Sequence, residues 1–425
     1  MKFVVAANGS RGDVQPAVAL ATELTERGHE ITMLVRPNLT EFSAGAGLPT
    51  QAYGDSTRAV LDSELVRERM KSRNPVTRLR AVTELTLRGG RAMQHQLLDA
   101  TDGADAIISG SAGQERAHNV SRARGIPHVP VHLCPMRRNR STSLLAHVGI
   151  DASPAVAHLS WRLVEWTLWW AGRSAEDTLC ADLGLEPVRA PFATQIEATG
   201  IPEIQAYDPA LFPALTAEWG SRRPLVGFFA LPGGLRSGVG DEAADDLLEW
   251  IEADTPPVYV GFGSMLPSDP QRVANAFRSA AGELDLRLLV SGGWSDFMSG
   301  VTDERIRVVG HIDHDTILPR CAAAVHHGGA GSVAAGLRAG IPTVVTWVGA
   351  DQPIWGRAIT ASHAGTSLPM SRVDDMRIVD ALGAALEDRT RHTAAEMSRH
   401  LIPAAQAVST AADVVEQAVR ASRTG

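Results

Sequence analysis

The stretch AAAVHHGGAGSVAAGLRAGIPTVVTWVGADQPIWG, residues 322–356, carries the pattern that decides the fold class of this chain. The apolar run at residues 322–326 predicts a short buried strand, and the glycines after it predict a tight turn. Small residues at about 332–339 are typical of a helix, and the apolar run Thr343–Trp347 predicts a second buried strand. Strand, turn, helix and strand in this order indicate a parallel α/β sheet.

The Gly-rich turn before this helix suits an anion. Glycines let the backbone approach a ligand closely, and the unpaired N–H groups at a helix start carry partial positive charge. His327 precedes the turn and Ser332 opens the helix, so each can add a hydrogen-bond donor. The glycines alone are equally consistent with a tight strand-to-helix connection. The acid and amide Asp351 and Gln352, at the exit of the next strand, favour the ligand-binding interpretation.

The N-terminal residues repeat this order of elements. The apolar run Lys2–Ala7 predicts a buried strand, residues 14–27 have helical periodicity, and Glu30–Val35 predicts the next strand. The loop at residues 8–13 follows the first strand, and parallel sheets bind ligands at this edge. Asp13 in this loop has a structural role available, because it suits the N-cap of the helix.

Three segments together resemble the signatures of a known family: HHGGAGS (326–332), ADQP (350–353) and GSRGDVQP (9–16). They are similar to those of the family-1 glycosyltransferases, which have the two-domain GT-B fold. The nearest resemblance is to the bacterial branch that glycosylates antibiotics, sterols and mycobacterial glycopeptidolipids, with vancomycin-type enzymes among the relatives. The resemblance implies an α/β fold with two Rossmann-like domains that face each other across a cleft.

The resemblance and a change in composition together predict how the chain is divided. Residues 219–240 become rich in Pro and Gly and end in LPGGLRSGVG, so we expect the linker there. Residues 1–218 are then the acceptor-binding domain, and residues 241–403 are the nucleotide-sugar-binding domain. In this fold the last helix, here residues 404–421, commonly packs back on the first domain.

The resemblance also implies which residues hold the donor. The diphosphate is expected against the turn and nearby polar groups, namely Ser264, His327, Gly329, Ala330, Gly331, Ser332, Ser10 and Arg11. Asp351 and Gln352 are expected to bind hydroxyls of the transferred sugar. The nucleobase is expected beside Trp294, His311 and Ile312, with backbone groups near Ile312 reading its edge.

The same resemblance gives Asp13 a catalytic role. Many relatives have a histidine here as general base, whereas the vancomycin-type branch has an aspartate, as this chain does. Transfer of a sugar to a hydroxyl needs a group that takes the acceptor's proton, and such groups contribute roughly 10²–10⁴-fold. A carboxylate with a pKa of about 3.9 is already ionised at neutral pH. Histidine-based relatives usually carry a helper aspartate on a later strand, but residues 106–112 contain no acid. This favours a directly acting Asp13.

A metal-dependent mechanism is not expected. Asp313-His314-Asp315 superficially matches the DxD metal motif of the other glycosyltransferase fold, but its acids precede a predicted helix, where capping explains them. Clustered donors at a helix start can stabilise a leaving diphosphate without a divalent ion. His311 and His314 lack nearby partners for a zinc site. We therefore expect no metal and no cofactor besides the nucleotide-sugar substrate.

Residues 158–170, HLSWRLVEWTLWW, contain four of the nine tryptophans. The apolar residues of this segment fall on one broad helical face, with Leu159, Leu163, Trp166 and Trp170 at its centre and Trp161, Leu168 and Trp169 beside them. Tryptophans usually belong to a core. The alternatives are an aromatic wall that lines the pocket of a large apolar acceptor and a patch that rests on a membrane. All four tryptophans are therefore candidates for the acceptor pocket.

The segment HLCPMRRNRS, residues 132–141, predicts a cationic loop after a strand. We interpret Arg137, Arg138 and Arg140 as solvated. The alternative is that they meet an acidic acceptor or an anionic membrane surface.

Bulk properties exclude several classes of protein. The length of 425 residues favours two domains, and 44% hydrophobic with 21% charged residues is typical of a globular protein. A net charge of −8 argues against a nucleic-acid partner. The 3 cysteines are too few for a disulfide framework. With no secretory leader and no long apolar run, a cytoplasmic protein is expected.

These observations predict an inverting glycosyltransferase. It would move a hexose or deoxyhexose from a UDP- or dTDP-sugar to a hydroxyl of a large apolar acceptor, such as a polyketide, glycopeptide, lipopeptide or sterol. The alternatives are an isomerase like the nucleotide-sugar 2-epimerases and a catalytically silent nucleotide-sugar-binding partner protein. A dehydrogenase is disfavoured, because GSRGDV lacks the GxGxxG spacing. The chain is expected to be a monomer or a homodimer.

Overall fold

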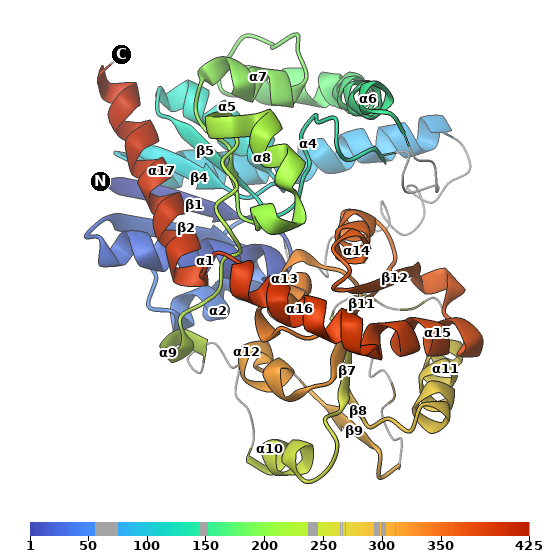
Figure 1. Cartoon of the computed structure of the whole chain (residues 1–425). Helices are drawn as coiled ribbons and strands as arrows, with labels where there is room; N and C mark the ends of the chain where they lie inside the picture. Colours follow the sequence, from blue (N-terminus) through green and yellow to red (C-terminus); the bar gives the residue numbers. More distant parts are fainter. Residues whose placement is uncertain are drawn as a thin grey trace. The chain divides into compact units, whose positions relative to one another are not determined.

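Two six-stranded parallel sheets form the framework of the protein (Figure 1). The computed structural model describes residues 1–55, 75–144, 152–236, 245–263, 265, 267, 269–292, 298, 303–310 and 312–424. The chain divides into two units. The first contains Met1–Pro209, Ala214–Val239 and Pro403–Gly425, and the second contains Ala210–Pro213 and Gly240–Ile402. The predicted α/β fold with two Rossmann-like domains is confirmed.

The first sheet has the strand order β3-β2-β1-β4-β5-β6. Its elements are β1 (Lys2–Ala7), α1 (Arg11–Glu26), β2 (Glu30–Val35), α2 (Thr40–Gly45), β3 (Thr50–Ala52), α4 (Pro75–Ala100), β4 (Ala106–Ser109), α5 (Gln114–Arg124), β5 (His128–His132), α6 (Pro154–Ala181), α7 (Phe192–Thr199), β6 (Ile204–Gln205), α8 (Pro213–Trp219), α9 (Gly233–Arg236) and the last helix, α17 (Ala404–Thr424). Strands and helices alternate in the sequence because the chain must cross back over the sheet between two parallel neighbouring strands, and a helix usually makes this connection.

The second sheet has the order β12-β11-β10-β7-β8-β9. Its unit contains α10 (Asp245–Glu252), β7 (Val258–Gly261), α11 (Pro270–Glu283), β8 (Leu288–Ser291), β9 (Ile306–Val309), α12 (His314–Ile317), β10 (Ala323–His326), α13 (Ala330–Ala339), β11 (Thr343–Trp347), α14 (Gln352–Ala361), β12 (Gly365–Pro369), α15 (Asp375–Leu386) and α16 (Asp388–His400). The middle strands β7, β8 and β10 are fully buried, as their apolar runs predict.

In both sheets the strand order changes direction at one place. The chain moves outward from β1 to β2 and β3, and then returns to build β4, β5 and β6 on the other side of β1. In the second sheet it moves outward from β7 to β8 and β9, and then returns to build β10, β11 and β12. Ligands of open α/β sheets bind at such switch points, beyond the carboxyl ends of the strands. Ligand sites are therefore expected at the carboxyl ends of β1 and β4 in the first sheet and of β7 and β10 in the second.

The last helix, α17, belongs to the first unit and packs against α1 (Figure 1). The guanidinium of Arg27, just after α1, donates to Asp413 Oδ1 at 2.6 Å and to the backbone oxygen of Ser409 at 2.9 Å. His29 Nε2 lies 2.9 Å from Glu416 Oε1. The hydrogen bonds from His29 and Arg27 hold the pKa of Glu416 below its ordinary value. Polar contacts thus join α17 to the first sheet in addition to apolar packing.

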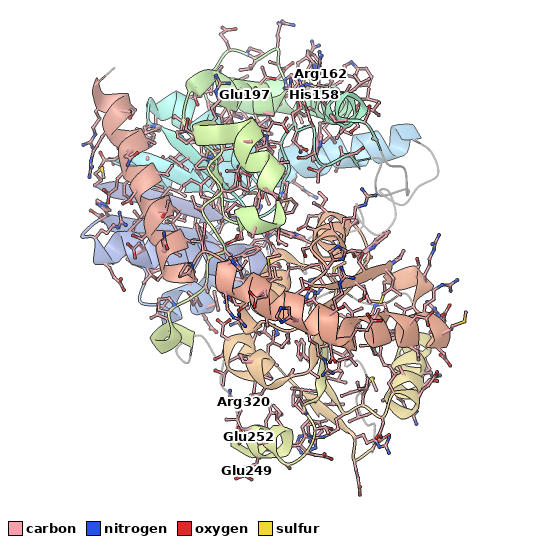
Figure 2. All side chains as sticks on the ribbon, viewed as in Figure 1. His158, Arg162, Glu197, Glu249, Glu252 and Arg320 are labelled. Atoms are coloured by element: carbon pink, nitrogen blue, oxygen red, sulfur yellow. The ribbon has the colours of Figure 1, made fainter. Side chains whose placement is uncertain are left out.

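The tryptophan-rich segment forms the middle of α6, and most of it is not core. Trp161 is buried, and its Nε1 donates to the backbone oxygen of Thr142 at 2.7 Å. Trp166 and Trp170 are 47% and 69% exposed. The common expectation that tryptophans pack in a core is therefore wrong for these two. Figure 2 labels His158 and Arg162 on the same helix. Among the described residues, no helix is both long and apolar enough to cross a bilayer.

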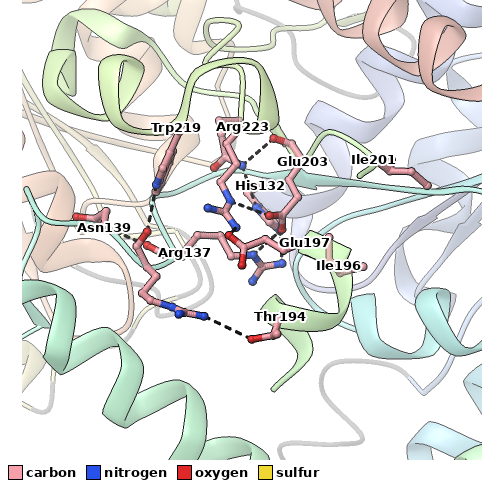
Figure 3. Close-up of polar contacts among 12 residues, drawn as sticks. His132, Arg137, Asn139, Thr194, Ile196, Glu197, Ile201, Glu203, Trp219 and Arg223 are labelled. Carbon is pink, nitrogen blue, oxygen red and sulfur yellow. Dashed lines mark hydrogen bonds and ion pairs between the residues drawn. The ribbon is translucent and has the colours of Figure 1, made fainter. Parts of the chain in front are cut away.

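The interpretation of the 132–141 loop as solvated is wrong for Arg137 (Figure 3). This side chain is buried, and its Nε donates to Glu203 Oε2 at 2.5 Å. Arg223 Nε donates to the other oxygen of Glu203 at 2.7 Å, so one buried carboxylate holds two guanidinium groups. Arg138 pairs with Glu165 of α6 at 2.9 Å, and only Arg140 is exposed. Buried charges need such partners, and these partners are distant in sequence.

Replacing Arg27 with methionine is expected to loosen α17. Arg27→Met removes the charge-assisted hydrogen bonds to Asp413 and Ser409, so we expect a loss of about 1–2 kcal/mol in the free energy of unfolding, measured with urea. The lowered pKa of Glu416 means that its contribution is present above its ordinary pKa and is lost as pH falls through the lowered value. The difference between the two proteins should therefore shrink in acid.

Arg420→Met is the matched control. Arg420 pairs with Glu416 from an exposed position on α17 itself, so its loss should change the free energy of unfolding by less than about 0.5 kcal/mol. Equal effects of the two substitutions would contradict the proposed role of Arg27.

Candidate active site

The first candidate site is the turn between β10 and α13 in the second unit. β10 ends at His326, and α13 begins at Ala330 with Gly329 at its N-cap. No side chain caps this helix, so its first N–H groups point out of the helix end without a side-chain acceptor. The helix has ten residues and therefore a substantial dipole. The predicted strand, turn and helix are all present, although the helix begins two residues earlier than predicted.

Space at this turn permits only glycine at two positions. Gly328 has φ +87°, and a Cβ there would lie 2.6 Å from Val345 Cγ1 of the neighbouring strand β11. A Cβ on Gly329 would lie 2.6 Å from His327 Nε2. Both distances are shorter than real carbon contacts, so a larger residue would displace the histidine or the strand. Packing therefore favours glycine at both positions, most strongly at Gly328, where φ is also positive.

His327 projects from this turn as a neutral hydrogen-bonding group. Its Nδ1 is buried and has no hydrogen-bond partner among the described residues. Burial lowers the pKa of His327 to about 4, and the neighbouring His314 acts in the same direction. At neutral pH the ring is therefore uncharged and donates through one nitrogen. Gly263 follows β7 and lies beside it, because a Cβ there would be 3.4 Å from His327 Cε1. The loops after β7 and β10 thus meet at the switch point.

Asp351 and Gln352 lie against the same turn. A Cβ on Gly328 would be 3.3 Å from Gln352 Cβ. Gln352 is buried, and its Oε1 accepts hydrogen bonds from Val348 N at 2.7 Å and Gly349 N at 3.2 Å. Asp351 is the N-cap residue of α14, and its Oδ2 accepts from Trp355 Nε1 at 3.0 Å. The pair therefore orders the loop after β11. Its predicted contacts with sugar hydroxyls stay a prediction.

The second candidate site surrounds Asp13 in the first unit. The helix α1 begins at Arg11, so Ser10 is its N-cap and Asp13 is its third residue. Asp13 is therefore not the N-cap that its position suggested, because the chain enters the helix earlier. Asp13 Oδ2 accepts from Ser10 N at 2.7 Å and from Ser10 Oγ at 3.0 Å. Gly9 has φ +145°, and any Cβ there would overlap the Asp13 carboxylate.

Asp13 lines a small pocket at the β1/β4 switch point. Its lining combines polar and apolar residues, among them Asn8, Ser109, Gly110, Ser111, Leu20 and Val131. Burial raises the pKa of Asp13 above its ordinary value, while the hydrogen bonds from Ser10 and the charge of Arg36 oppose this rise. A raised pKa makes the ionised carboxylate a stronger proton acceptor. The arrangement thus suits a general base.

The other residues predicted to bind the donor lie in both units or outside the described part of the chain. Ser10 and Arg11 belong to the first unit, where Ser10 bonds to Asp13 and the Arg11 guanidinium lies 4.6 Å from the centre of the Phe42 ring. Ile312 is buried in the core of the second unit, so only its backbone can meet a nucleobase. Three predicted residues lie outside the described part of the chain: Ser264, Trp294 and His311.

The four tryptophans of α6 are not among the residues that line the Asp13 pocket in the described part of the chain. Two residues that the sequence interpretation left out, Asn8 and Ser109, do line it. Asn8 directly precedes the GSRGDVQP segment, and Ser109 ends a predicted strand, so both could have been found by inspecting strand ends.

The capping explanation of Asp313-His314-Asp315 is confirmed for Asp313, whereas Asp315 lies inside the helix. Asp313 Oδ1 accepts from Asp315 N at 3.1 Å at the start of α12. Asp315 pairs with Arg338 at 2.9 Å, and His314 Nε2 lies 2.9 Å from the hydroxyl of Tyr259. Each of these groups has a structural partner.

The arrangement defines a class of protein: two Rossmann-like units, each with a polar site at its switch point. Comparisons with known proteins agree. Residues 279–420 match the family "Erythromycin biosynthesis protein CIII-like, C-terminal domain", and residues 3–86 match "Glycosyltransferase family 28 N-terminal domain". The uncharacterized glycosyltransferase Rv1524 of Mycobacterium tuberculosis is 36% identical over 425 residues, which are 100% of both chains. Sterol 3-beta-glucosyltransferase UGT80A2 of Arabidopsis thaliana is 29% identical over 94% of this chain and 63% of its own length.

Solved structures show the same fold. The glycotransferase of kitacinnamycin superposes with a TM-score of 0.72 at 18% identity and covers 98% of both chains. Glycosyltransferase VinC in complex with dTDP gives 0.62 at 16% identity, over 99% of this chain and 100% of that one. The protein belongs to the family-1 glycosyltransferases with the GT-B fold, and it is a glycosyltransferase. The isomerase and silent-binding alternatives are not favoured.

Gly329→Ala is expected to weaken binding of a nucleoside diphosphate. The new Cβ would displace the His327 ring from the start of α13, so we expect the Kd for UDP or dTDP to rise at least about tenfold, measured by titration calorimetry. Gly383→Ala in α15 is the matched control, because a Cβ there meets nothing within 4 Å. Unchanged affinity of the Gly329→Ala protein for both nucleotides would remove this turn as the diphosphate site.

Proposed function

We propose that this enzyme transfers a hexose or deoxyhexose from a UDP- or dTDP-sugar to a hydroxyl of a large apolar acceptor, with inversion at the anomeric carbon. The observation on which the proposal rests is the environment of the Asp13 carboxylate. One carboxylate oxygen is fixed by Ser10, the pKa is raised by burial, and the group lines a small pocket together with polar and apolar residues.

In the proposed reaction the acceptor oxygen attacks the anomeric carbon. Asp13 takes the hydroxyl proton as this bond forms, and the bond from the anomeric carbon to the diphosphate oxygen breaks. The electron pair of that bond leaves with the nucleoside diphosphate. The free N–H groups at the start of α13 and the neutral His327 would stabilise the charge that builds on the departing group. Such preorganised donors cost no rearrangement during the reaction.

The donor is proposed to lie on the second unit. The turn at Gly329–Ser332, with Ser332 in the first turn of α13, would hold the diphosphate, and Asp351 and Gln352 would orient the sugar. The complex of VinC with dTDP supports a thymidine nucleotide, and the name of the sterol glucosyltransferase supports a glucosyl donor. A panel of UDP- and dTDP-sugars tested for thermal stabilisation would identify the donor. A ligand at 100 times its Kd adds about 2.7 kcal/mol to the free energy of unfolding.

The acceptor is proposed to bind the first unit with its hydroxyl at Asp13. The apolar side chains in the lining, such as Leu20 and Val131, support an acceptor that is apolar next to the hydroxyl that meets Asp13. Sterols and the polyketide, glycopeptide and lipopeptide natural products are the classes to test. We place the reaction in the cytoplasm, which is supported by three cysteines that form no disulfide.

Asp13→Asn is expected to lower kcat by roughly 10²–10⁴-fold with little change in donor affinity, because the amide cannot accept the proton. In the unsubstituted enzyme kcat/KM should fall as pH drops through the raised pKa of Asp13. Ser10→Ala removes a hydrogen bond that lowers this pKa, so the acid limb should move to higher pH.

Glu26→Gln, at the far end of α1, is the matched control and should retain activity. A folded Asp13→Asn protein with near-native turnover would show that another group is the base.

The transfer is proposed to need no divalent cation. The acids of the DxD-like segment are committed to helix capping and to Arg338, which supports a mechanism that relies on backbone and side-chain donors. Initial rates should therefore be the same with excess EDTA and with added Mg²⁺ or Mn²⁺. A loss of activity in EDTA that is restored by Mg²⁺ would disprove this.

A further inference from the structure

The outer face of α6 is the largest concentration of exposed apolar side chains in the described part of the chain. Seven of the nine large hydrophobic residues that are exposed there lie on this one helix. We define the α6 face by the four at its centre: Leu159, Leu163, Trp166 and Trp170, which are 61%, 67%, 47% and 69% exposed. Their spacing places them on one side of the helix over roughly 16 Å. Soluble surfaces rarely expose such continuous apolar patches without a partner.

Two acidic side chains of α6 lie on the side of the helix that faces the first unit. Glu165 is turned to Arg138, and Glu176 is bonded to Arg116 and Asn119. These acids therefore face the body of the first unit and are neutralised there.

Arg162 and Arg173 are exposed beside the apolar stripe. Arg162 has no hydrogen bond or ion pair among the described residues and is labelled in Figure 2. The guanidinium of Arg173 lies 5.7 Å from the centre of the Trp169 ring and 3.7 Å from Asp177. The outer side of the helix is thus apolar, with Arg162 beside it as a cation that pairs with no described residue and with Arg173 paired to Asp177.

We propose that the α6 face docks the enzyme on the surface of an anionic lipid bilayer. Tryptophan suits the membrane–water interface, since it joins a large apolar ring to one polar N–H group. Exposed arginines beside the stripe complement anionic headgroups. The helix would lie in the interface, because no described helix can cross a bilayer.

Charge on the outer side of α6 disfavours a second copy of the chain as the occupant. A symmetric contact between two copies would place Arg162, which pairs with no described residue, on both sides of the interface, and like-charge repulsion opposes this. The net charge of −8 does not prevent docking, because a bilayer senses mainly charges within a Debye length of about 8 Å at physiological salt. The local charge beside the stripe is positive.

Docking does not depend on the proposed reaction, but it would serve it. It would hold the first unit, which carries Asp13, at the phase where a large apolar acceptor dissolves. This benefit for the acceptor rests on the proposed function, whereas vesicle binding is measured without sugar transfer.

The test is sedimentation of the full chain with vesicles. One set contains phosphatidylcholine alone, and the other contains phosphatidylcholine with phosphatidylglycerol. We expect binding to the anionic vesicles that weakens as salt is added. Trp166→Ser with Trp170→Ser should reduce the partition coefficient at least about tenfold, because two large apolar side chains are lost. Arg162→Gln with Arg173→Gln should reduce it about fivefold or more, on anionic vesicles only.

Met376→Ser is the matched control, since Met376 is 70% exposed on α15 of the other unit and should not matter. Circular dichroism and nucleotide-induced thermal stabilisation verify that each variant is folded. The proposal is overturned if the unsubstituted chain ignores anionic vesicles, or if the double tryptophan variant binds them equally well. It is also overturned if light scattering shows a dimer that the tryptophan variant dissociates, because the face would then be a self-association surface. If the unsubstituted chain binds the vesicles but transfers no sugar in solution, only the proposed function is contradicted.

Discussion

The candidate site of the second unit depends on the close packing of the turn from β10 into α13. Gly328 lies against Val345 and Gly329 against His327, so a β-carbon at either position would force its neighbour to move. This close packing does two things at once. It exposes the first N–H groups of an uncapped ten-residue helix, and it buries His327 enough to keep the ring neutral. A site built in this way stabilises an anion with fixed dipoles and needs no full positive charge of its own. The geometry is present before any ligand arrives.

In the first unit, two opposing effects act on one carboxylate. Burial raises the pKa of Asp13, while the N–H and hydroxyl of Ser10 and the charge of Arg36 lower it. Both hydrogen bonds from Ser10 reach the same oxygen, Oδ2, which orients the other oxygen independently of any substrate. Gly9 is part of this arrangement, because a side chain there would occupy the place of the carboxylate. The same sequence element therefore sets the backbone turn, the orientation of the Asp13 carboxylate and its proton affinity.

The sequence predicted the buried parts of this structure better than the edges. β1, β2 and β11 have the predicted bounds, because continuous apolar runs mark strands that are covered on both faces. β3, β6 and β12 were not predicted, and all three are edge strands; Thr50–Ala52, Ile204–Gln205 and Gly365–Pro369 are short or polar and carry little periodicity. Local signals placed the helix starts within a few residues and found the HHGGAGS turn. They could not place Asp13 as third residue of α1, because the choice between Ser10 and Asp13 as cap depends on the backbone path after Gly9.

The arginines of the first unit show why local sequence cannot separate buried from exposed charge. Arg137 lies in a run of polar and basic residues, yet it is buried because Glu203 and Gln114 reach it from other elements. Arg162 lies among leucines and tryptophans, yet it is exposed. A buried guanidinium is tolerated only with partners that replace water, and Glu203 serves two of them at once. The loop after β5 is thereby fixed, and Leu133 at its start lines the Asp13 pocket. Buried charge in this loop thus helps shape the pocket that Asp13 lines, whereas the guanidinium of Arg162 on α6 is left at the surface.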